Sequence, residues 1–340
     1  MTFAQQPRYC RRHPGPNVPA LRGMRTLLSL LPACLAACLL ALCFLPPVAM
    51  PAQNAAATGR ETPVSIRDDA GQTVSLAAPA RRIIPLYAAL SETLLALGLD
   101  KQIIARTISD DILPASLSAV GTHMRPNPEL IAALKPDLVV QLEGRSEAGL
   151  AAQSLTRLGS PVARFRISSF EELFSCIERL GVLCGRKQEA ASLVAGMRER
   201  LKAVKERVPQ GAPTPSVFFE VRYPNLLGAG AGSMLSDIIT AAGGENSLKK
   251  YPDRMVRLSE EMLVSLNPDI YLVQQGPMNK NPSPPEQRAH FSSLGAIRNG
   301  FVFFVPETRF SRPGPQSVTA VEELAEILRQ WREKRQSYAE

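Results

Sequence analysis

The sequence predicts an α/β fold: two Rossmann-like lobes with parallel sheets, joined by one long rigid α-helix, with a cleft between the lobes. One observation is a repeat, because 129–141 (ELIAALKPDLVVQ) and 261–273 (EMLVSLNPDIYLV) share a glutamate seven positions before Pro-Asp and then an apolar run. The other is the alternation of strand and helix patterns in both halves, which is typical of parallel sheets covered by helices. Copies about 130 residues apart indicate two similar lobes.

The first lobe reads as an entry hairpin followed by alternating strands and helices. The hairpin lies within 58–81 and turns at Ala70-Gly71. The first repeat helix begins with Asn127 as N-cap and Pro128 at its first position, which both favour a helix start. The other expected elements are the strand RIIPL, the helix SETLLALGL ending at Gly98, the strands QIIAR and PDLVVQ, a helix over about 147–158 and the strand PVARFRI.

A long helical region connects the two lobes. Ser169 opens it with the capping-box pattern Ser-Phe-Glu-Glu, and apolar residues recur at helical spacing to about Val208, with interruptions at Gly181 and Gly185. The second lobe is expected to contain the strand SVFFEVR, the glycine-rich stretch LLGAGAGS, the helix MLSDIITAAG, the second repeat helix with Ser259 as N-cap, the strand FVFFV and a final helix from about Gln316 to Arg335. The predicted domains are an export segment 1–57, an N-terminal lobe 58–167, a connecting helical backbone 168–208 and a C-terminal lobe 209–340.

The N-terminus has the pattern of an export signal. Arg22 and Arg25 precede an apolar run from about Leu27 to Met50, and small residues follow it. Met24 is an alternative start to Met1. Three outcomes stay open: cleavage after Ala52 or Ala57, lipid attachment at Cys38 in the box Leu-Ala-Ala-Cys, and an uncleaved anchor. The predicted location is periplasmic or otherwise extracytoplasmic.

The net charge argues against nucleic-acid binding, and the spacing of the cysteines argues against a disulfide. The formal net charge is +8, but 1–50 carry five arginines and no acidic residue, so the remainder is only about +3. A remaining charge this small does not indicate the concentrated basic surface that nucleic-acid binding requires. Cys176 and Cys184 lie eight residues apart in a helical stretch, which separates them by about 12 Å of helical rise, too far for a disulfide. Both are expected in the apolar core.

The sequence contains no motif for bond-making chemistry. It has no GxSxG elbow, Walker loop, zincin or EF-hand motif. The stretch GAGAGS at 228–233 lacks the ending and spacing of a nucleotide-binding loop, so it is expected to form a tight turn before a helix. The chain is therefore predicted to bind a ligand without being an enzyme, and no cofactor is expected.

Seven segments between about 60 and 335 follow one another in a fixed order: DDAGQTVSLAAPARRIIPL, SETLLALGL, VGTHMRPNPELIAALKPDLVV, AAGGENSL, LSEEMLVSLNPDIYLV, SLGAIRNGFVFFVP and RFSRPGPQSVTAVEELAEIL. Taken in this order, they resemble the periplasmic substrate-binding proteins of ABC importers for iron–siderophores, haem and cobalamin. It implies a protein that captures a metal chelate (a ferric siderophore, haem or a corrinoid) between its lobes. It also implies delivery to an ABC permease dimer with a cytoplasmic ATPase, by a monomer that meets the membrane only through its signal, a lipid anchor or the permease.

The repeated glutamates are the residues most directly assigned by this resemblance. The N-caps place Glu129 and Glu261 each at the second position of its helix. In the family, a glutamate at this place on each lobe docks into arginine pockets of the permease, and charge-assisted pairs suit that task. Stabilisation of the helix dipole by a first-turn acid is the alternative explanation. Glu260 would take this role if the register is shifted by one.

Candidate cleft residues lie in loops that follow strands or directly precede the two repeat helices, because the loops after the strands face the opposite lobe in a repeated α/β topology. Met255 falls where a cobalamin binder of the family would have a tryptophan, which argues against cobalamin. The candidates are Tyr87, Ser109, Asp110, His123, Met124 and Arg125 in the first lobe, and Arg222, Tyr223, Met255, Arg257, Phe310 and Arg312 in the second. The arginines Arg125, Arg222, Arg257 and Arg312 are candidates to pair with carboxylate or catecholate oxygens of an anionic chelate.

Metal contact is assigned with less specificity. His123, Met124 and His290 are candidate axial ligands for haem iron or for an exposed metal in a chelate. Two other functions are alternatives to chelate capture. A zinc- or manganese-binding protein of a related importer would need three or four converging His, Asp or Glu ligands. A nitrogenase-component-like enzyme would keep cysteines at its cleft for a metallocluster, which Cys176 and Cys184 do not match.

Overall fold

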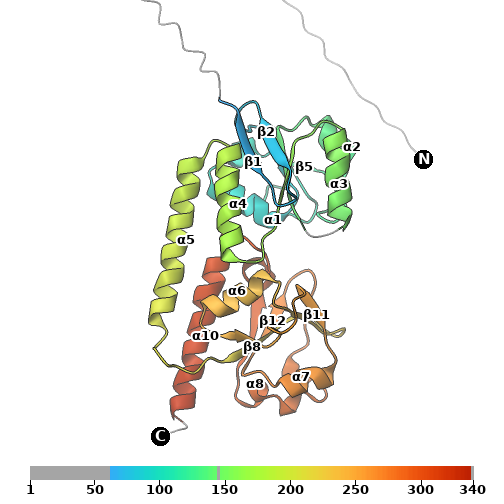
Figure 1. Cartoon of the computed structure of the whole chain (residues 1–340). Helices are drawn as coiled ribbons and strands as arrows, with labels where there is room; N and C mark the ends of the chain where they lie inside the picture. Colours follow the sequence, from blue (N-terminus) through green and yellow to red (C-terminus); the bar gives the residue numbers. More distant parts are fainter. Residues whose placement is uncertain (1–61, 144–145, 338–340) are drawn as a thin grey trace, which may run out of the picture. The chain divides into compact units, whose positions relative to one another are not determined.

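The computed structural model describes residues 62–143 and 146–337, and Arg60–Glu340 form one compact unit (Figure 1). The predicted signal, with its cleavage sites and Cys38, lies outside the described residues. Within the described ranges, no helix has the length and apolar character needed to cross a membrane. The domain boundaries expected from the sequence stay a prediction.

The N-terminal lobe is a small parallel α/β layer with an antiparallel hairpin at its entrance. The hairpin consists of β1 (Val64–Arg67) and β2 (Thr73–Leu76), as predicted. The parallel sheet has the order β3 (Ile83–Pro85), β6 (Leu138–Leu142) and β7 (Val162–Phe165), and β4 (Ala105–Arg106) pairs in parallel with β5 (Ser118–Ala119). Its helices are α1 (Ala88–Ala96), α2 (Pro128–Ala133) and α3 (Ser146–Arg157).

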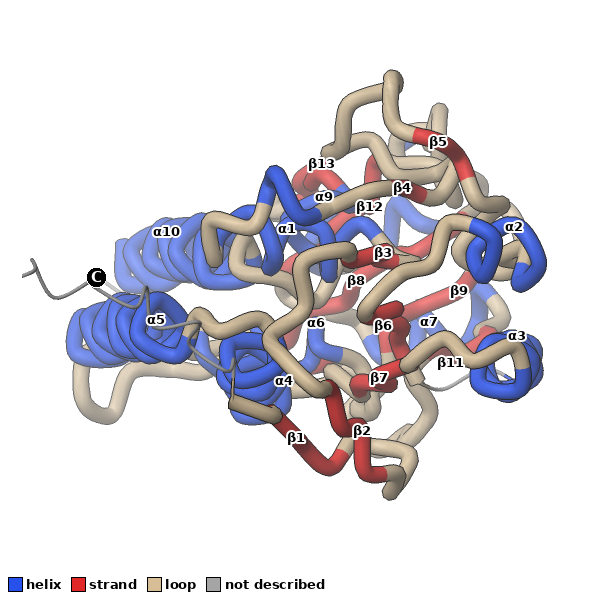
Figure 2. The backbone as a smooth tube through the Cα atoms, turned by 90° about the horizontal axis from the view of Figure 1, so that it is seen from above, coloured by secondary structure: helices blue, strands red, loops and turns tan. Residues whose placement is uncertain are grey.

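The connecting region is a pair of helices rather than one. These are α4 (Phe170–Leu183) and the longer α5 (Lys187–Arg207), which pack side by side (Figures 1 and 2). The break falls at Gly185, whose φ of +67° lies in the left-handed region that glycine tolerates best. Ser169 caps α4 by accepting the Glu172 N–H, but Glu172 returns to the N–H of Ser168, so only half of the predicted capping box forms.

The C-terminal lobe is built on a mixed sheet. The strand order is β11 (Met255–Arg257), β9 (Leu227–Ala229), β8 (Ser216–Arg222), β12 (Ile270–Gln275) and β13 (Val302–Pro306), and β10 (Glu245–Asn246) also pairs with β8. Strands β8, β10, β12 and β13 run parallel, whereas β9 and β11 are antiparallel to their neighbours. The helices are α6 (Met234–Ala241), α7 (Glu260–Leu266), α8 (Gly295–Arg298), α9 (Glu307–Phe310) and α10 (Ser317–Ser337).

The aspartate of the repeated Pro-Asp pair makes equivalent hydrogen bonds in the two lobes. Asp137 accepts the N–H groups of Arg81 and Arg82, each at 2.9 Å, immediately before β3. Asp269 accepts the N–H and the hydroxyl of Ser216, each at 2.8 Å, at the start of β8. Each aspartate therefore fixes the beginning of the neighbouring parallel strand. The Pro-Asp half of the repeat is therefore part of the scaffold in both lobes.

One continuous apolar core runs from the hairpin through α4 and into α10. It includes Cys176 and Cys184, which are buried free thiols. Burial raises the pKa of the Cys184 thiol to about 12, so it stays protonated and apolar. Because this core is shared between the lobes, large hinge motions between them would have to open buried apolar contacts.

Candidate functional site

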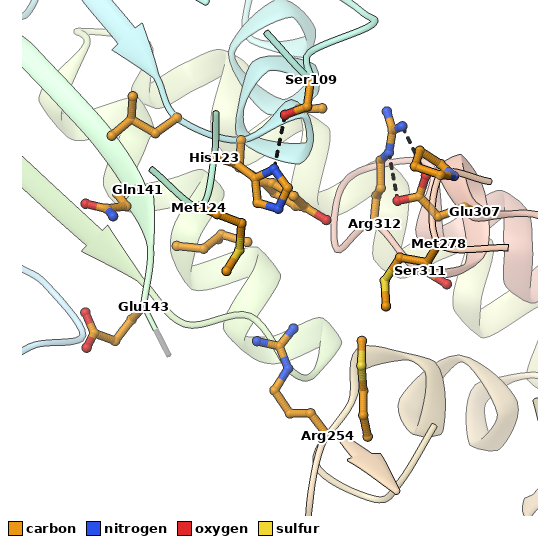
Figure 3. A pocket seen from close by; sticks show the side chains of 16 residues that line it. Ser109, His123, Met124, Gln141, Glu143, Arg254, Met278, Glu307, Ser311 and Arg312 are labelled. Atoms are coloured by element: carbon orange, nitrogen blue, oxygen red, sulfur yellow. Dashed lines mark hydrogen bonds and ion pairs between the residues drawn. The ribbon is translucent and has the colours of Figure 1, made fainter. Parts of the chain in front are cut away.

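A cavity of about 430 Å³ lies where the carboxyl ends of the parallel strands of both lobes meet. Residues at or after the ends of β3, β4, β5 and β6 line one side. Residues after β12 and β13, together with Arg254 and Met255 at the start of β11, line the other. Figure 3 shows His123 and Met124 on the first side, Met278 and Arg312 on the second, and Arg254 extending toward the space between them. The lining residues are Leu86, Tyr87, Ala88, Ser109, His123, Met124, Gln141, Leu142, Glu143, Arg254, Met255, Pro277, Met278, Glu307, Ser311 and Arg312.

The first-lobe wall is organised around His123. Its imidazole Nδ1 shares a hydrogen bond of 3.1 Å with the hydroxyl of Ser109. Its ring packs edge-on against Tyr87, with the ring centroids 5.4 Å apart. Tyr87 lies two residues after the end of β3 and is the N-cap residue of α1. Two separate segments, one with Tyr87 and one with Ser109, therefore orient the His123 imidazole beside Met124 at the cavity wall.

The second-lobe wall combines methionines with one arginine. Met255 and Met278 are each 42% exposed, which is high for large apolar side chains. Arg254 is also exposed, and within residues 62–143 and 146–337 no hydrogen bond or ion pair engages its guanidinium. The glycine-rich stretch supports this wall, because a Cβ on Gly230 would lie 2.2 Å from the carbonyl oxygen of Asp253.

Arg312 lines the cavity, but two carboxylates already neutralise it. Its Nη2 lies 3.0 Å from Asp111 Oδ2 and 3.2 Å from Glu307 Oε2. Burial opposes the charge, yet the hydrogen bonds to Asp111 and Glu307 outweigh it and raise the pKa of Arg312. The hydrogen bond from Arg312 is the main reason why the pKa of Asp111 is lowered. Burial of the Asp111 carboxyl acts in the opposite direction. The Arg312–Asp111 ion pair links the two lobes at the cavity edge. Because the Arg312 guanidinium is already paired with two carboxylates, it is poorly placed to bind an anionic cargo.

Two of the predicted cleft residues are structural parts of the chain near the cavity. Asp110 is 4% exposed, and its carboxylate accepts hydrogen bonds from the Ser91 hydroxyl and the N–H of Leu113. Phe310 is fully buried and stacks on Phe219, with ring centroids 6.3 Å apart. Neither side chain lines the cavity, because Asp110 accepts hydrogen bonds within its own loop and Phe310 packs in the apolar core.

The remaining predicted cleft residues also lie outside the cavity lining. Arg125 and Arg257 are exposed at the surface. Tyr223 donates its hydroxyl hydrogen to Glu260 at 3.0 Å, and Arg222 is half-buried at the end of β8. The structure thus brings Tyr87, Ser109, His123, Met124, Met255 and Arg312 together at one cavity and leaves the other six candidates away from it.

Sequence reasoning missed several lining residues that follow the same rule. Gln141 and Glu143 lie at and just after the end of β6, and Met278 and Glu307 follow β12 and β13. Their position at or after the end of a parallel strand is the sequence signal that marks them. Arg254 precedes the antiparallel strand β11, and nothing in the local sequence marks it.

The two repeated glutamates occupy equivalent places on α2 and α7. Asn127 accepts the Leu130 N–H at 2.9 Å, and Ser259 accepts the Met262 N–H at 3.2 Å, so both predicted N-caps are present. Glu129 and Glu261 are therefore each the second helical residue, and both are exposed. In both views α2 and α7 lie on the side of the unit away from α5 (Figures 1 and 2). The hydrogen bond from Ser259 is the main cause of a lowered pKa at Glu261.

His290 lies away from the cavity lining. It is exposed, has a φ of +67° and precedes the short helix Phe291–Ser293. Its charge contributes to the lowered pKa of Glu261, which places it near the start of α7. In the described part of the chain, no group of three or more His, Cys, Asp or Glu residues converges to hold a metal ion.

Comparisons with known proteins agree with this architecture. The ABC transporter substrate-binding lipoprotein YvrC of Bacillus subtilis (strain 168) is 29% identical over 273 residues, 78% of this chain and 85% of YvrC. The vitamin B12-binding protein of Vibrio campbellii (strain ATCC BAA-1116) is 25% identical, covering 76% of this chain and 92% of that protein. Haem-bound IsdE of S. aureus has the same fold, with a TM-score of 0.64, 24% identity, and coverage of 72% of this chain and 98% of IsdE.

The family assignment rests on the extent of the match. A family model described as periplasmic binding protein matches residues 83–308, which is more than half of the chain. That span begins at β3, ends in α9 and includes most of the cavity lining. The two-lobed architecture, the cavity between strand ends and this match agree. The chain therefore belongs to the periplasmic binding protein family.

Proposed function

We propose that this protein is the extracytoplasmic substrate-binding component of an ABC importer, which captures a metal chelate and delivers it to the membrane permease. The observation that carries the proposal is the cavity lined by the strand ends of both lobes. Its volume of about 430 Å³ is within the range of small-molecule sites, about 300–1,000 Å³. A ligand held there contacts both lobes at once, and delivery requires its later release to the permease.

The lining suits a bulky, partly apolar chelate. Tyr87, Met124, Met255 and Met278 provide apolar and polarisable surface, and Met adapts to irregular shapes. His123 and Met124 are side chains of the types that haem iron accepts as axial ligands. These features fit a ferric siderophore, haem or a corrinoid as cargo. A bare zinc or manganese ion, the alternative, fits a wall of this size and apolar character poorly.

The relatives support the transport role. YvrC is a substrate-binding lipoprotein of an ABC transporter, and the proteins from Vibrio campbellii and S. aureus bind vitamin B12 and haem. By analogy, the partner is an ABC permease with its ATPase, and the docking residues are Glu129 and Glu261. Export by the N-terminal segment, with lipid attachment at Cys38 as one outcome, belongs to the same proposal.

A titration with three probes tests the cargo class directly. Haemin, cyanocobalamin and a ferric hydroxamate are added separately to the purified protein, and thermal unfolding and visible absorbance are recorded. Ligand at 1,000 times its Kd stabilises a native protein by about 4 kcal/mol, so the true class produces a clear rise in Tm. If none of the probes changes Tm or the spectrum, the metal-chelate proposal is wrong.

Arg254→Met is expected to weaken binding of an anionic chelate by about tenfold or more, because it removes a charge-assisted hydrogen bond worth about 1.5–3 kcal/mol. Little change is expected for a corrinoid whose periphery carries amides. The matched control is Arg257→Met, an exposed arginine in the adjacent strand that does not line the cavity. Equal losses in both variants would show that Arg254 only adds to the general positive charge.

A further inference from the structure

Residues 276–294, here called the bridging loop, connect β12 to α8 and reach both the cavity and α7. At one end, Pro277 and Met278 line the cavity. At the other end, Phe291 is fully buried and packs edge-on against Tyr223, with ring centroids 5.9 Å apart. The short helix Phe291–Ser293 contacts α7, which carries Glu261. One segment therefore joins the cargo site to the proposed docking helix.

The cavity end of the bridging loop is a tight turn anchored from below. The backbones of Gly276 and Asn279 exchange hydrogen bonds of 2.9 and 3.3 Å, which places Pro277 and Met278 at the tip. The Asn279 amide group donates to the Gln274 carbonyl at 3.1 Å and to Glu220 Oε1 at 3.2 Å. The position of Met278 in the cavity wall is thus set by the side chain that follows it.

The anchor is a buried ion pair. The Glu220 carboxylate is fully buried in β8 and accepts hydrogen bonds from the Tyr271 hydroxyl at 2.6 Å, from Asn279 and from both terminal nitrogens of Arg288. The Arg288 side chain is only 2% exposed. Well-packed apolar side chains usually match a buried ion pair in stability, so stability alone is a weak reason for this arrangement. Directional hydrogen bonds hold the loop in one register, which apolar packing does less strictly.

The same arginine continues the contact toward α7. Its guanidinium lies 3.9 Å from the centre of the Tyr223 ring. The Tyr223 hydroxyl donates to Glu260 Oε1 at 3.0 Å, and Glu260 is the first residue of α7, immediately before Glu261. Side-chain contacts therefore run without a gap from the turn that carries Met278 to the start of α7.

We infer that Glu220 and Arg288 are positioning residues that hold the bridging loop and thereby couple the cavity wall at Met278 to the start of α7. The assignment of cargo to the cavity end of the bridging loop and of the permease to its α7 end rests on the proposed function. The coupling between the two ends rests on the contacts alone. A shift of the Met278 turn on cargo binding displaces Asn279 against Glu220, and Arg288 transmits the displacement to Tyr223 and Glu260. The occupied and empty states would then differ at the docking helix.

Hydrogen–deuterium exchange on the whole protein, without cargo, tests the positioning role. Tyr223→Phe removes only the hydroxyl and keeps the ring under Arg288, so amides of α7 should exchange about tenfold faster while the bridging loop is unchanged. Glu220→Gln should speed exchange in both segments. Helix α6, in the same lobe, reports global destabilisation and should not change. Tyr251→Phe, at an exposed tyrosine, is the matched control.

Two outcomes would overturn the inference. One is unchanged exchange in α7 of Tyr223→Phe, and the other is an equal rise in α6, α7 and the loop, which would mean a purely structural contribution. If Glu220→Gln does not fold, because Arg288 is left buried without its partner, Tyr223→Phe still decides the question.

A second measurement separates the coupling from the proposed function. Whichever of haemin, cyanocobalamin and a ferric hydroxamate binds should protect both the bridging loop and α7 in the wild-type protein. In Tyr223→Phe the loop should stay protected while α7 loses its protection. Equal protection of α7 in both proteins would refute the coupling and leave the proposed function standing. If no probe binds, the proposed function fails, and the exchange comparison without cargo still judges the positioning role.

Discussion

Reversing both repeated glutamates, Glu129→Arg together with Glu261→Arg, is expected to abolish uptake of the cargo while its affinity for the isolated protein stays unchanged. Each carboxylate would lose a charge-assisted pair worth about 1.5–3 kcal/mol, so the loss in docking is on the order of 100-fold or more. Neither residue lines the cavity, which is why affinity is spared. Uptake of the labelled chelate by cells carrying only the variant, beside a titration of the purified protein, measures both effects.

The control for this experiment must carry the same charge change elsewhere. Glu199→Arg together with Glu206→Arg replaces two other exposed glutamates, both in α5 and outside the cavity lining, and should leave uptake near the wild-type level. Helix-dipole stabilisation predicts something different, namely a small loss of folding stability at each site without loss of uptake. Retained uptake in the double reversal would therefore favour the dipole explanation and contradict docking.

The fold was predictable because its signals are local. The caps at Asn127 and Ser259 and the Pro-Asp pairs each act within a few residues or on the neighbouring strand, and each appears twice. The break of the connecting region into α4 and α5 was visible as two glycines, but their effect on a long helix depends on packing. Strand β9 was missed because Leu227–Ala229 is short and glycine-rich, and its pairing with β8 and β11 is what makes it a strand.

The site was only half predictable because its chemistry depends on distant partners. Arg312 was expected to meet an anionic cargo, but Asp111 lies 201 positions away in the sequence and neutralises it across the lobes. Phe310 follows a strand like a cleft residue and yet points into the core against Phe219. Position after a strand predicts where a residue lies along the chain. Which way its side chain points depends on the tertiary packing.

Glu92 is another residue whose behaviour depends on a distant partner. Its carboxyl group should make the free energy of unfolding depend on pH. Its carboxylate, on α1 of the first lobe, accepts the Gln316 N–H of the second lobe at 2.6 Å. Burial raises the pKa of Glu92 from its usual 4.5 to about 7, although the Gln316 N–H and the charge of Arg312 partly oppose the shift. The folded state therefore prefers the protonated acid. Its contribution to stability is complete below pH 4.5 and is lost as the pH rises to about 7.

Glu92→Gln should accordingly unfold like the wild type near pH 4.5 and be more stable above pH 7. The two pKa values correspond to a difference of about 3 kcal/mol in the free energy of unfolding. Urea unfolding at pH 4.5, 6 and 8 measures this, with Glu286→Gln as the exposed control that removes the same charge. A gain that does not grow with pH, or one shared by the control, would mean that Glu92 ionises at its usual pH. A gain confined to Glu92→Gln would identify burial of the ionised Glu92 carboxylate between the lobes as the cause of the lost stability.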